Sequence, residues 1–279
     1  MPAEIIDVTQ RNWARTASGR GPTGERLFLK QFIGRDGIAR RILYDDERSG
    51  MELARRCFKE QVTIPRTIGH CDEQLITCYE HLDFVTVEAD LRRNASSLTA
   101  RWAPVCEHLG RLVDATADPS TVDRCGALPV KERRYASGRR AVNFKGFEIR
   151  NLAVLERARP DHERPGLAAF DMGRPYLGPV EEVAARLLVS ALLLNWGFPV
   201  SRFVQGPPAQ LADTLASNLS PWLHPTAVRD ELEREARARR TVTRFGSLWL
   251  QATKTSGFAT IGSWYLRRAR RWCRDRGLA

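Results

Sequence analysis

The first third of the chain alternates between apolar and polar residues in short runs, which is the pattern of half-buried β-strands. Residues 5–17 are β-like, residues 18–25 form a glycine-rich turn, and residues 26–33 alternate as a strand does. On this last strand Lys30 shares a face with two phenylalanines. A lysine in that position is either a solvated strand residue or has a specific role.

In the next segment the spacing of apolar residues predicts a helix, then two strands, then a second helix. Residues 44–60 begin with acids and end with bases, which suits the dipole of a helix. Residues 63–71 and 74–82 predict two more strands, and residues 101–117 predict an amphipathic helix. The basic stretch 123–146 has no clear period, and we expect it to be irregular.

The second half of the chain is mainly helical in pattern. Residues 151–158 and 166–170 predict a hairpin with a charged, proline-containing loop, followed by a region of proline and glycine turns. Residues 180–197 begin with two acids and continue as an apolar run, which predicts a buried helix ending near Gly197. Residues 207–279 are mainly helical.

This order of elements predicts an α+β chain with two lobes. Residues 1–82 form a sheet-rich N-lobe with one helix, and residues 83–279 form a helical C-lobe that contains the hairpin and a basic C-terminal helix.

Composition fits a globular protein. Of 279 residues, 43% are hydrophobic and 28% are charged. The N-terminus does not look like a signal peptide, and the longest apolar stretch is shorter than the roughly 20 residues that a membrane span needs. Six cysteines show neither a C-x-x-C pair nor zinc-site spacing, so we expect reduced thiols and a cytoplasmic location.

The net charge of +11 suits nucleic acid, an anionic membrane surface or phosphorylated ligands as partners. Residues 261–276 combine aromatics and arginines at helical spacing. They predict either a helix docked on the core with a solvated basic face, or an interfacial helix in peripheral contact with anionic lipid. No zinc-finger or RNA-recognition pattern is present, so we expect no nucleic-acid partner.

The hairpin carries two residues that suit a metal ion. Asp171 follows the apolar run 167–170 and precedes Gly173, while Asn151 begins the preceding strand. Asn151 and Asp171 can therefore face one another at the open end of the hairpin. Carboxylate and amide oxygens are ligands that Mg²⁺ accepts, so these residues predict either a magnesium site or an ordinary turn.

A metal that carries phosphate also needs a cation for the phosphates and an acid to hold that cation. Lys30 is the candidate cation, and Glu47 on the following helix is its candidate partner, with Glu52 as the second choice. Two further acids, Asp45 and Asp46, leave open the alternative that this cluster only caps the helix.

In this order, Lys30, Glu47, "GFEIRNLAV" and "AAFDMG" resemble the protein-kinase-like fold. The closest resemblance is to its small-molecule and lipopolysaccharide-core branch, which includes the aminoglycoside and sugar phosphotransferases. The best match is "FDMGRPYLGPVEEVAARLLVSALLL", and the resemblance covers roughly residues 10–200. It implies a phosphotransferase that uses ATP and Mg²⁺ to phosphorylate a hydroxyl of a sugar, a glycolipid or a small metabolite.

The resemblance also implies roles for individual residues. Lys30 would bind the ATP phosphates and Glu47 would hold Lys30. Asn151 and Asp171 would hold Mg²⁺. The backbone of a hinge from Glu80 to Leu82 would meet the adenine.

The chain departs from the family at the catalytic base. The family places an Asp five residues before the Asn, but Gly146 occupies that position here. Glu148 is the nearest acid and the candidate base. The alternative is a pseudokinase that binds nucleotide, or keeps only the fold, and acts as a regulatory or scaffold protein. With a glycolipid acceptor, the C-terminal helix would place the protein at the membrane periphery.

Overall fold

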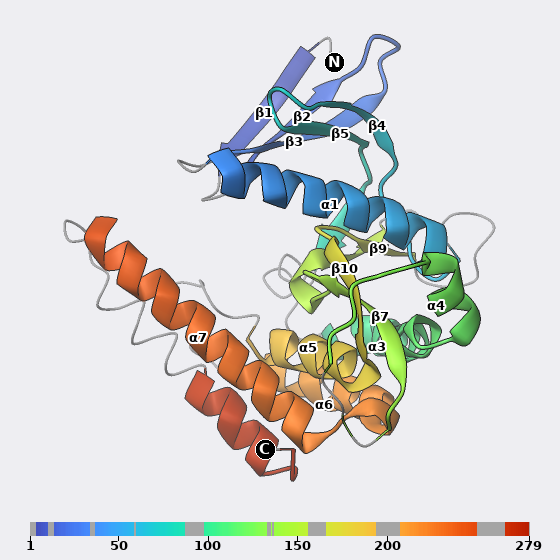
Figure 1. Cartoon of the computed structure of the whole chain (residues 1–279), viewed down its shortest axis with the longest axis vertical. Helices are drawn as coiled ribbons and strands as arrows, with labels where there is room; N and C mark the ends of the chain where they lie inside the picture. The colour runs from blue at the N-terminus through green and yellow to red at the C-terminus, as the bar shows by residue number, and fades with distance from the viewer. Residues whose placement is uncertain are drawn as a thin grey trace.

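The chain folds with a sheet at one end and helices at the other (Figure 1). The structure is a computed structural model that describes residues 4–10, 14–33, 37–58, 60–86, 98–132, 135, 137–155, 166–193, 207–249 and 266–278.

The N-terminal part is an antiparallel five-stranded sheet in the order β1-β2-β3-β5-β4. Its strands are β1 (Glu4–Gln10), β2 (Ala14–Arg20), β3 (Arg26–Phe32), β4 (Thr67–Cys71) and β5 (Ile76–Glu80). Residues 5–17, predicted as one β-like segment, lie in two strands that pair with each other. The prediction missed the break because both strands have the same alternating pattern.

Helix α1 (Gly37–Phe58) lies between the sheet and the helical part (Figure 1). It begins seven residues before the predicted start at residue 44. Because the early residues include alanine, leucine and two arginines, which favour helix, the acids at positions 45 and 46 do not mark its beginning. Tyr44, Glu47, Met51 and Ala54 recur at helical spacing and form its buried face.

The remaining helices and strands form the rest of the molecule. The helices are α3 (Leu98–Thr116), α4 (Pro119–Cys125), α5 (Val180–Leu192), α6 (Pro207–Leu219), α7 (Pro225–Trp249), a helical segment at 266–274 and two 3-10 turns, η1 (Ile149–Asn151) and η3 (Ser220–Trp222). The predicted hairpin forms from β8 (Leu152–Leu155) and β9 (Leu167–Ala169), and β6 (Phe84–Thr86) pairs with β8. Gly197, the predicted end of α5, lies outside the described residues. The predicted α+β arrangement is confirmed.

Two segments predicted to lack regular structure are strands. β7 (Arg140–Lys145) and β10 (Gly173–Pro179) form an antiparallel pair. Buried apolar residues drive β7 into the interior, although its basic flanks hide this pattern in the sequence. In β10 the prolines are tolerated because Pro175 lies at the irregular step of the ladder and Pro179 ends the strand, so neither missing N–H interrupts a regular pairing. The predictions of irregular structure and of turns at these positions were wrong.

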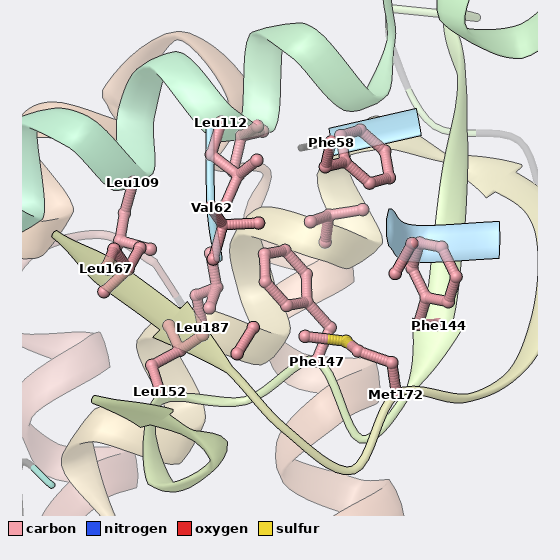
Figure 2. Packing of buried hydrophobic residues seen from close by; sticks show 14 of the residues in the cluster. Phe58, Val62, Leu109, Leu112, Phe144, Phe147, Leu152, Leu167, Met172 and Leu187 are labelled. Atoms are coloured by element: carbon pink, nitrogen blue, oxygen red, sulfur yellow. The ribbon is translucent and has the colours of Figure 1, made fainter. Parts of the chain in front are cut away.

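The main hydrophobic core includes residues at the adjoining ends of these strands (Figure 2). Phe144 and Phe147 flank the end of β7, and Met172 precedes β10; all three are buried. Phe144 stacks edge-on against Phe58 of α1 with ring centroids 5.9 Å apart. Because burying one such side chain contributes roughly 1.5–3 kcal/mol, the segments around the candidate metal ligands are tied to α1.

The glycine at position 50 lets α1 approach these segments closely. A Cβ atom at Gly50 would lie 2.0 Å from the carbonyl oxygen of Met172. Since α1 contacts β3 on one side and β10 on the other, it belongs to both parts of the molecule. The division of the chain at residue 82 therefore stays a prediction.

We expect Gly50→Ala to destabilise the protein by about 1–3 kcal/mol, the usual cost of overpacking. Helix propensity alone would give the opposite sign, a gain of about 1 kcal/mol. Gly37→Ala on the same helix is the control, because its Cβ would meet only a side-chain nitrogen of Arg40 at 3.6 Å. Urea unfolding measures both variants, and equal free energies of unfolding would show that the contact with Met172 costs nothing.

The described part of the basic C-terminal helix is docked on the core. Ala269, Trp272 and Cys273 are buried in a cluster that includes Leu188 of α5 and Val228 of α7. Figure 1 shows this helix beside α7. Residues 261–265 of the predicted interfacial segment lie outside the described residues. None of the described helices combines the length and apolar character needed to cross a membrane.

Candidate active site

Lys30 and Glu47 form a buried ion pair between β3 and α1. Lys30 Nζ donates to Glu47 Oε2, and the hydroxyl of Tyr79 donates to Glu47 Oε1 at 3.0 Å. The pairing predicted from the sequence is therefore present. The second choice, Glu52, is exposed. Lys30 pairs with Glu47 and not with Glu52 because helical spacing places Glu47 on the buried face of α1 and Glu52 on the exposed face.

Lys30 also reaches the acid at the end of the hairpin. Its Nζ donates to Asp171 Oδ1 at 2.6 Å, across a sequence separation of 141 residues. Burial by itself lowers the pKa of Lys30, but the negative charges of Glu47 and Asp171 outweigh it and raise the pKa above its usual value. Lys30 is thus a firmly charged cation held by two carboxylates.

Asp171 is held in an unusual backbone conformation next to Gly146. Asp171 has a φ of 56°, in the left-handed region that aspartate and asparagine enter more readily than most residues. Gly146 has a φ of 95°, and a Cβ atom there would lie 2.3 Å from the carbonyl oxygen of Asp171. Only glycine fits at position 146 in this arrangement.

Asn151 lies beside the same two residues. Its Nδ2 donates to the carbonyl of Gly146 at 2.7 Å, and its own carbonyl accepts from the backbone of Phe170 at 2.9 Å. The hydrogen bond to Gly146 fixes the orientation of the Asn151 amide. Its other side-chain atom, Oδ1, has no partner among the described residues. Asn151 and Asp171 therefore meet at the open end of the hairpin, as predicted.

The oxygens at this point are of the type that a divalent cation binds. Asp171 has a side chain that is 53% exposed, and only one of its two carboxylate oxygens is bonded to Lys30. Together with Asn151 Oδ1 this leaves two hard oxygen ligands. Magnesium sites of this kind complete their coordination with phosphate oxygens and water.

The predicted hinge follows β5. The backbone N–H of Glu80 donates to the carbonyl of Arg66 and its Oε1 accepts from the N–H of Arg66, both at 2.9 Å. The backbone N–H of Leu82, in contrast, has no partner within the described part of the chain. Of the two predicted hinge residues, Leu82 offers a free backbone donor and Glu80 is already bonded.

The glycine-rich turn at residues 18–25 lies at the hinge end of β3 and not over Lys30. It leads into Arg26, whose Nη1 donates to Asp83 Oδ1 at 2.5 Å. Lys30 is nearer the other end of β3, because it pairs with Thr16, two residues after the start of β2. The segment between β1 and β2, residues 11–13, lies outside the described residues.

No protein-family model matches the sequence, and no curated protein matches it. Solved structures do match it in shape. An amicoumacin kinase, hAmiN, in complex with AMP-PNP, Ca²⁺ and Ami is 13% identical, covers 96% of this chain and 88% of its own, and has a TM-score of 0.58. A choline kinase, LicA, from Streptococcus pneumoniae is 12% identical, with 98% and 95% coverage and a TM-score of 0.50.

The chain has a protein-kinase-like fold. The five-stranded sheet with α1 corresponds to the N-lobe of this fold, and the hairpin and helices correspond to the C-lobe.

In this kinase-like fold, Glu148 is tied to the C-lobe helices. Its side chain is buried, with Oε2 2.5 Å from Arg150 Nη2 and Oε1 3.5 Å from Arg234 Nη2 on α7. The backbone N–H of the next residue, Ile149, donates to Ser190 Oγ of α5 at 2.9 Å. Sequence reasoning did not identify Arg234, which is separated from Glu148 by 86 residues. The role of Glu148 as a base remains a prediction.

Sequence reasoning also missed Arg186 of α5, which supports both strands of the β7–β10 pair. Its Nη1 donates to the carbonyl of Phe144 at 2.6 Å, and its Nη2 donates to the hydroxyl of Tyr176 at 2.7 Å. Glu182, one turn earlier, balances its charge. The available signal was a lone arginine four residues after an acid in an otherwise apolar helix, because a buried charge requires partners.

We expect Gly146→Ala to destabilise this kinase-like fold through two effects. A left-handed residue with a side chain costs roughly 1–2 kcal/mol, and the contact with the Asp171 carbonyl adds a cost of about 1–3 kcal/mol for overpacking. Gly138→Ala separates them, because Gly138 has a φ of 63° and open space around it. If the two variants lose equal stability in urea unfolding, the contact with Asp171 contributes nothing.

Proposed function

We propose that the protein is a phosphotransferase that uses ATP and Mg²⁺ to phosphorylate a hydroxyl group of a small molecule. The observation that carries the proposal is the position of Lys30, which contacts Glu47 of the N-lobe helix and Asp171 of the C-lobe hairpin at once. A cation and a metal-binding acid side by side are what the phosphates of a nucleotide require. The small-molecule kinases with this fold support the proposal.

Each residue then has a task that follows from its position. Lys30 binds phosphate oxygens, and Glu47 orients the ammonium group of Lys30 toward the phosphates. Asp171 and Asn151 hold the divalent cation, which neutralises phosphate charge when it is bound. The free backbone N–H of Leu82 receives the adenine ring. Because phosphoryl transition states are loose, positioning and charge neutralisation supply most of the catalysis.

The similar structures support a small molecule as the acceptor, without specifying its chemical class. Amicoumacin kinase and choline kinase are named for small molecules, and a sugar or glycolipid acceptor is a narrower form of the proposal.

The proposal includes no membrane contact, because Trp272 and Cys273 of the C-terminal helix are buried. A cytoplasmic location stays a prediction from composition.

A pseudokinase is the second candidate function, and Gly146 is the observation that favours it. The position that carries the catalytic acid in the resembling family holds no side chain, and Glu148 contacts two arginines instead of solvent. Such a protein would bind nucleotide and transfer nothing.

One experiment separates the phosphotransferase from the pseudokinase. It measures transfer of phosphate from ATP to a panel of hydroxyl-bearing small molecules, in the wild type and in Glu148→Gln. We expect the wild type to transfer phosphate. In Glu148→Gln the rate of transfer should fall by much less than the factor of about 10²–10⁴ that a positioned general base contributes. The reason is that the carboxylate of Glu148 is committed to Arg150 and Arg234. A loss within that range at unchanged stability would identify Glu148 as the base. Binding of Mg-ATP without any transfer would establish the pseudokinase.

A further inference from the structure

We infer that the acceptor molecule is an anion, with a phosphate or carboxylate group close to the hydroxyl that receives the phosphoryl group. The inference rests on the proposed function and specifies its substrate class.

The position of the acceptor follows from the position of the metal ligands. For transfer, the acceptor oxygen must approach the terminal phosphorus to within about 3–3.5 Å. In the proposed function the phosphate would lie at Asp171 and Asn151, and Gly146 contacts both of these residues. The acceptor therefore lies against the segments that flank Gly146 and Asp171.

Exposed cations lie close in sequence to Gly146 and Asp171 on these segments. Lys145 precedes Gly146 and pairs with Gly173 across the β7–β10 ladder. Arg174 follows Gly173 at the irregular step in that ladder. Lys145 and Arg174 are both exposed, and neither has an ion-pair partner among the described residues. Two unpaired cations thus stand at the end of the ladder, next to Asp171.

The carboxylates of the same segments are already in use. Within residues 140–155 and 166–179, the acids are Glu148 and Asp171. Glu148 is buried between two arginines, and Asp171 is bonded to Lys30. A cationic acceptor would find repulsion here from Lys145 and Arg174, whereas an anionic group would find two partners. The net charge of +11 acts in the same direction over a longer range.

The test uses a small-molecule cell extract that an anion-exchange resin divides into a retained, anionic fraction and an unretained fraction. Each fraction is incubated with the protein, Mg²⁺ and ATP labelled in the terminal phosphate. We expect label to enter molecules of the retained fraction. Label that enters only the unretained fraction overturns this inference and leaves the proposed function standing. Label in neither fraction overturns the proposed function and the inference together.

A double variant, Lys145→Ala with Arg174→Ala, tests the residues themselves. Since a hydrogen bond to a charged group contributes 1.5–3 kcal/mol, or about tenfold and more in affinity, we expect KM for the anionic acceptor to rise by about tenfold or more. KM for ATP should hardly change. Arg229→Ala is the matched control, because Arg229 is an exposed arginine on α7, which packs against α5. Equal values of KM for the acceptor in wild type and double variant would overturn the assignment.

Discussion

Asp171→Ala is expected to remove the stabilisation that Mg-ATP gives to the wild-type protein. A ligand at about 100 times its dissociation constant adds about 2.7 kcal/mol of apparent stability. That corresponds to a rise in Tm of roughly 5 °C, since about 1 kcal/mol shifts the Tm of a chain of this size by roughly 2 °C. The variant should lose this rise, because Asp171 is the exposed carboxylate beside Asn151 and Lys30.

Two further variants make the result interpretable. Asp171→Asn keeps a residue that tolerates the φ of 56°, so its effect comes from charge and not from backbone strain. Asp213→Ala is the matched control, because Asp213 has a side chain that is 46% exposed and pairs with Arg276 at 2.5 Å. It should retain the full rise. If millimolar Mg-ATP leaves the wild-type Tm unchanged, the nucleotide site is absent.

Lys30→Met is expected to reduce both turnover and stability. Removing one preorganised group that stabilises transition-state charge costs about 10²- to 10³-fold in kcat. The variant also leaves Glu47 buried without its cation, and an uncompensated buried charge costs about 3–5 kcal/mol. Enzyme assays measure the first effect and urea unfolding measures the second.

The double variant Lys30→Met with Glu47→Gln separates the two effects. It removes the buried charge together with its partner, so we expect most of the lost stability to return while turnover stays low. A single Lys30→Met variant with wild-type turnover would return Lys30 to the role of a structural lysine. A single variant with wild-type stability would show that Glu47 takes up a proton at little cost.

Much of the site could be predicted from the sequence because its residues lie at the ends of elements with strong local patterns. Asp171 follows a short apolar strand, and Asn151 begins the strand that pairs with it, so their meeting needed only the hairpin. Lys30 and Glu47 lie on neighbouring elements, and the period of each element fixes the face that carries the side chain.

The features that sequence reasoning missed depend on contacts between distant segments. β7 and β10 pair across about thirty intervening residues, and in the sequence alone the prolines of β10 resemble turn residues. Arg234 is brought to Glu148 by the docking of α7, which no local pattern records. The start of α1 was misplaced because two acids within the helix resembled its first turn.

The close approach of Gly146 to Asp171 restricts how this lineage can change. An aspartate introduced at position 146 by one substitution would collide through its Cβ atom with the carbonyl of Asp171 in the present backbone. The peptide at Gly146 would first have to leave its φ of 95°, and the carbonyl of Asp171 would have to turn with it. Converting the present protein into one that carries an acid at this position therefore needs coordinated changes in two segments, not a single mutation.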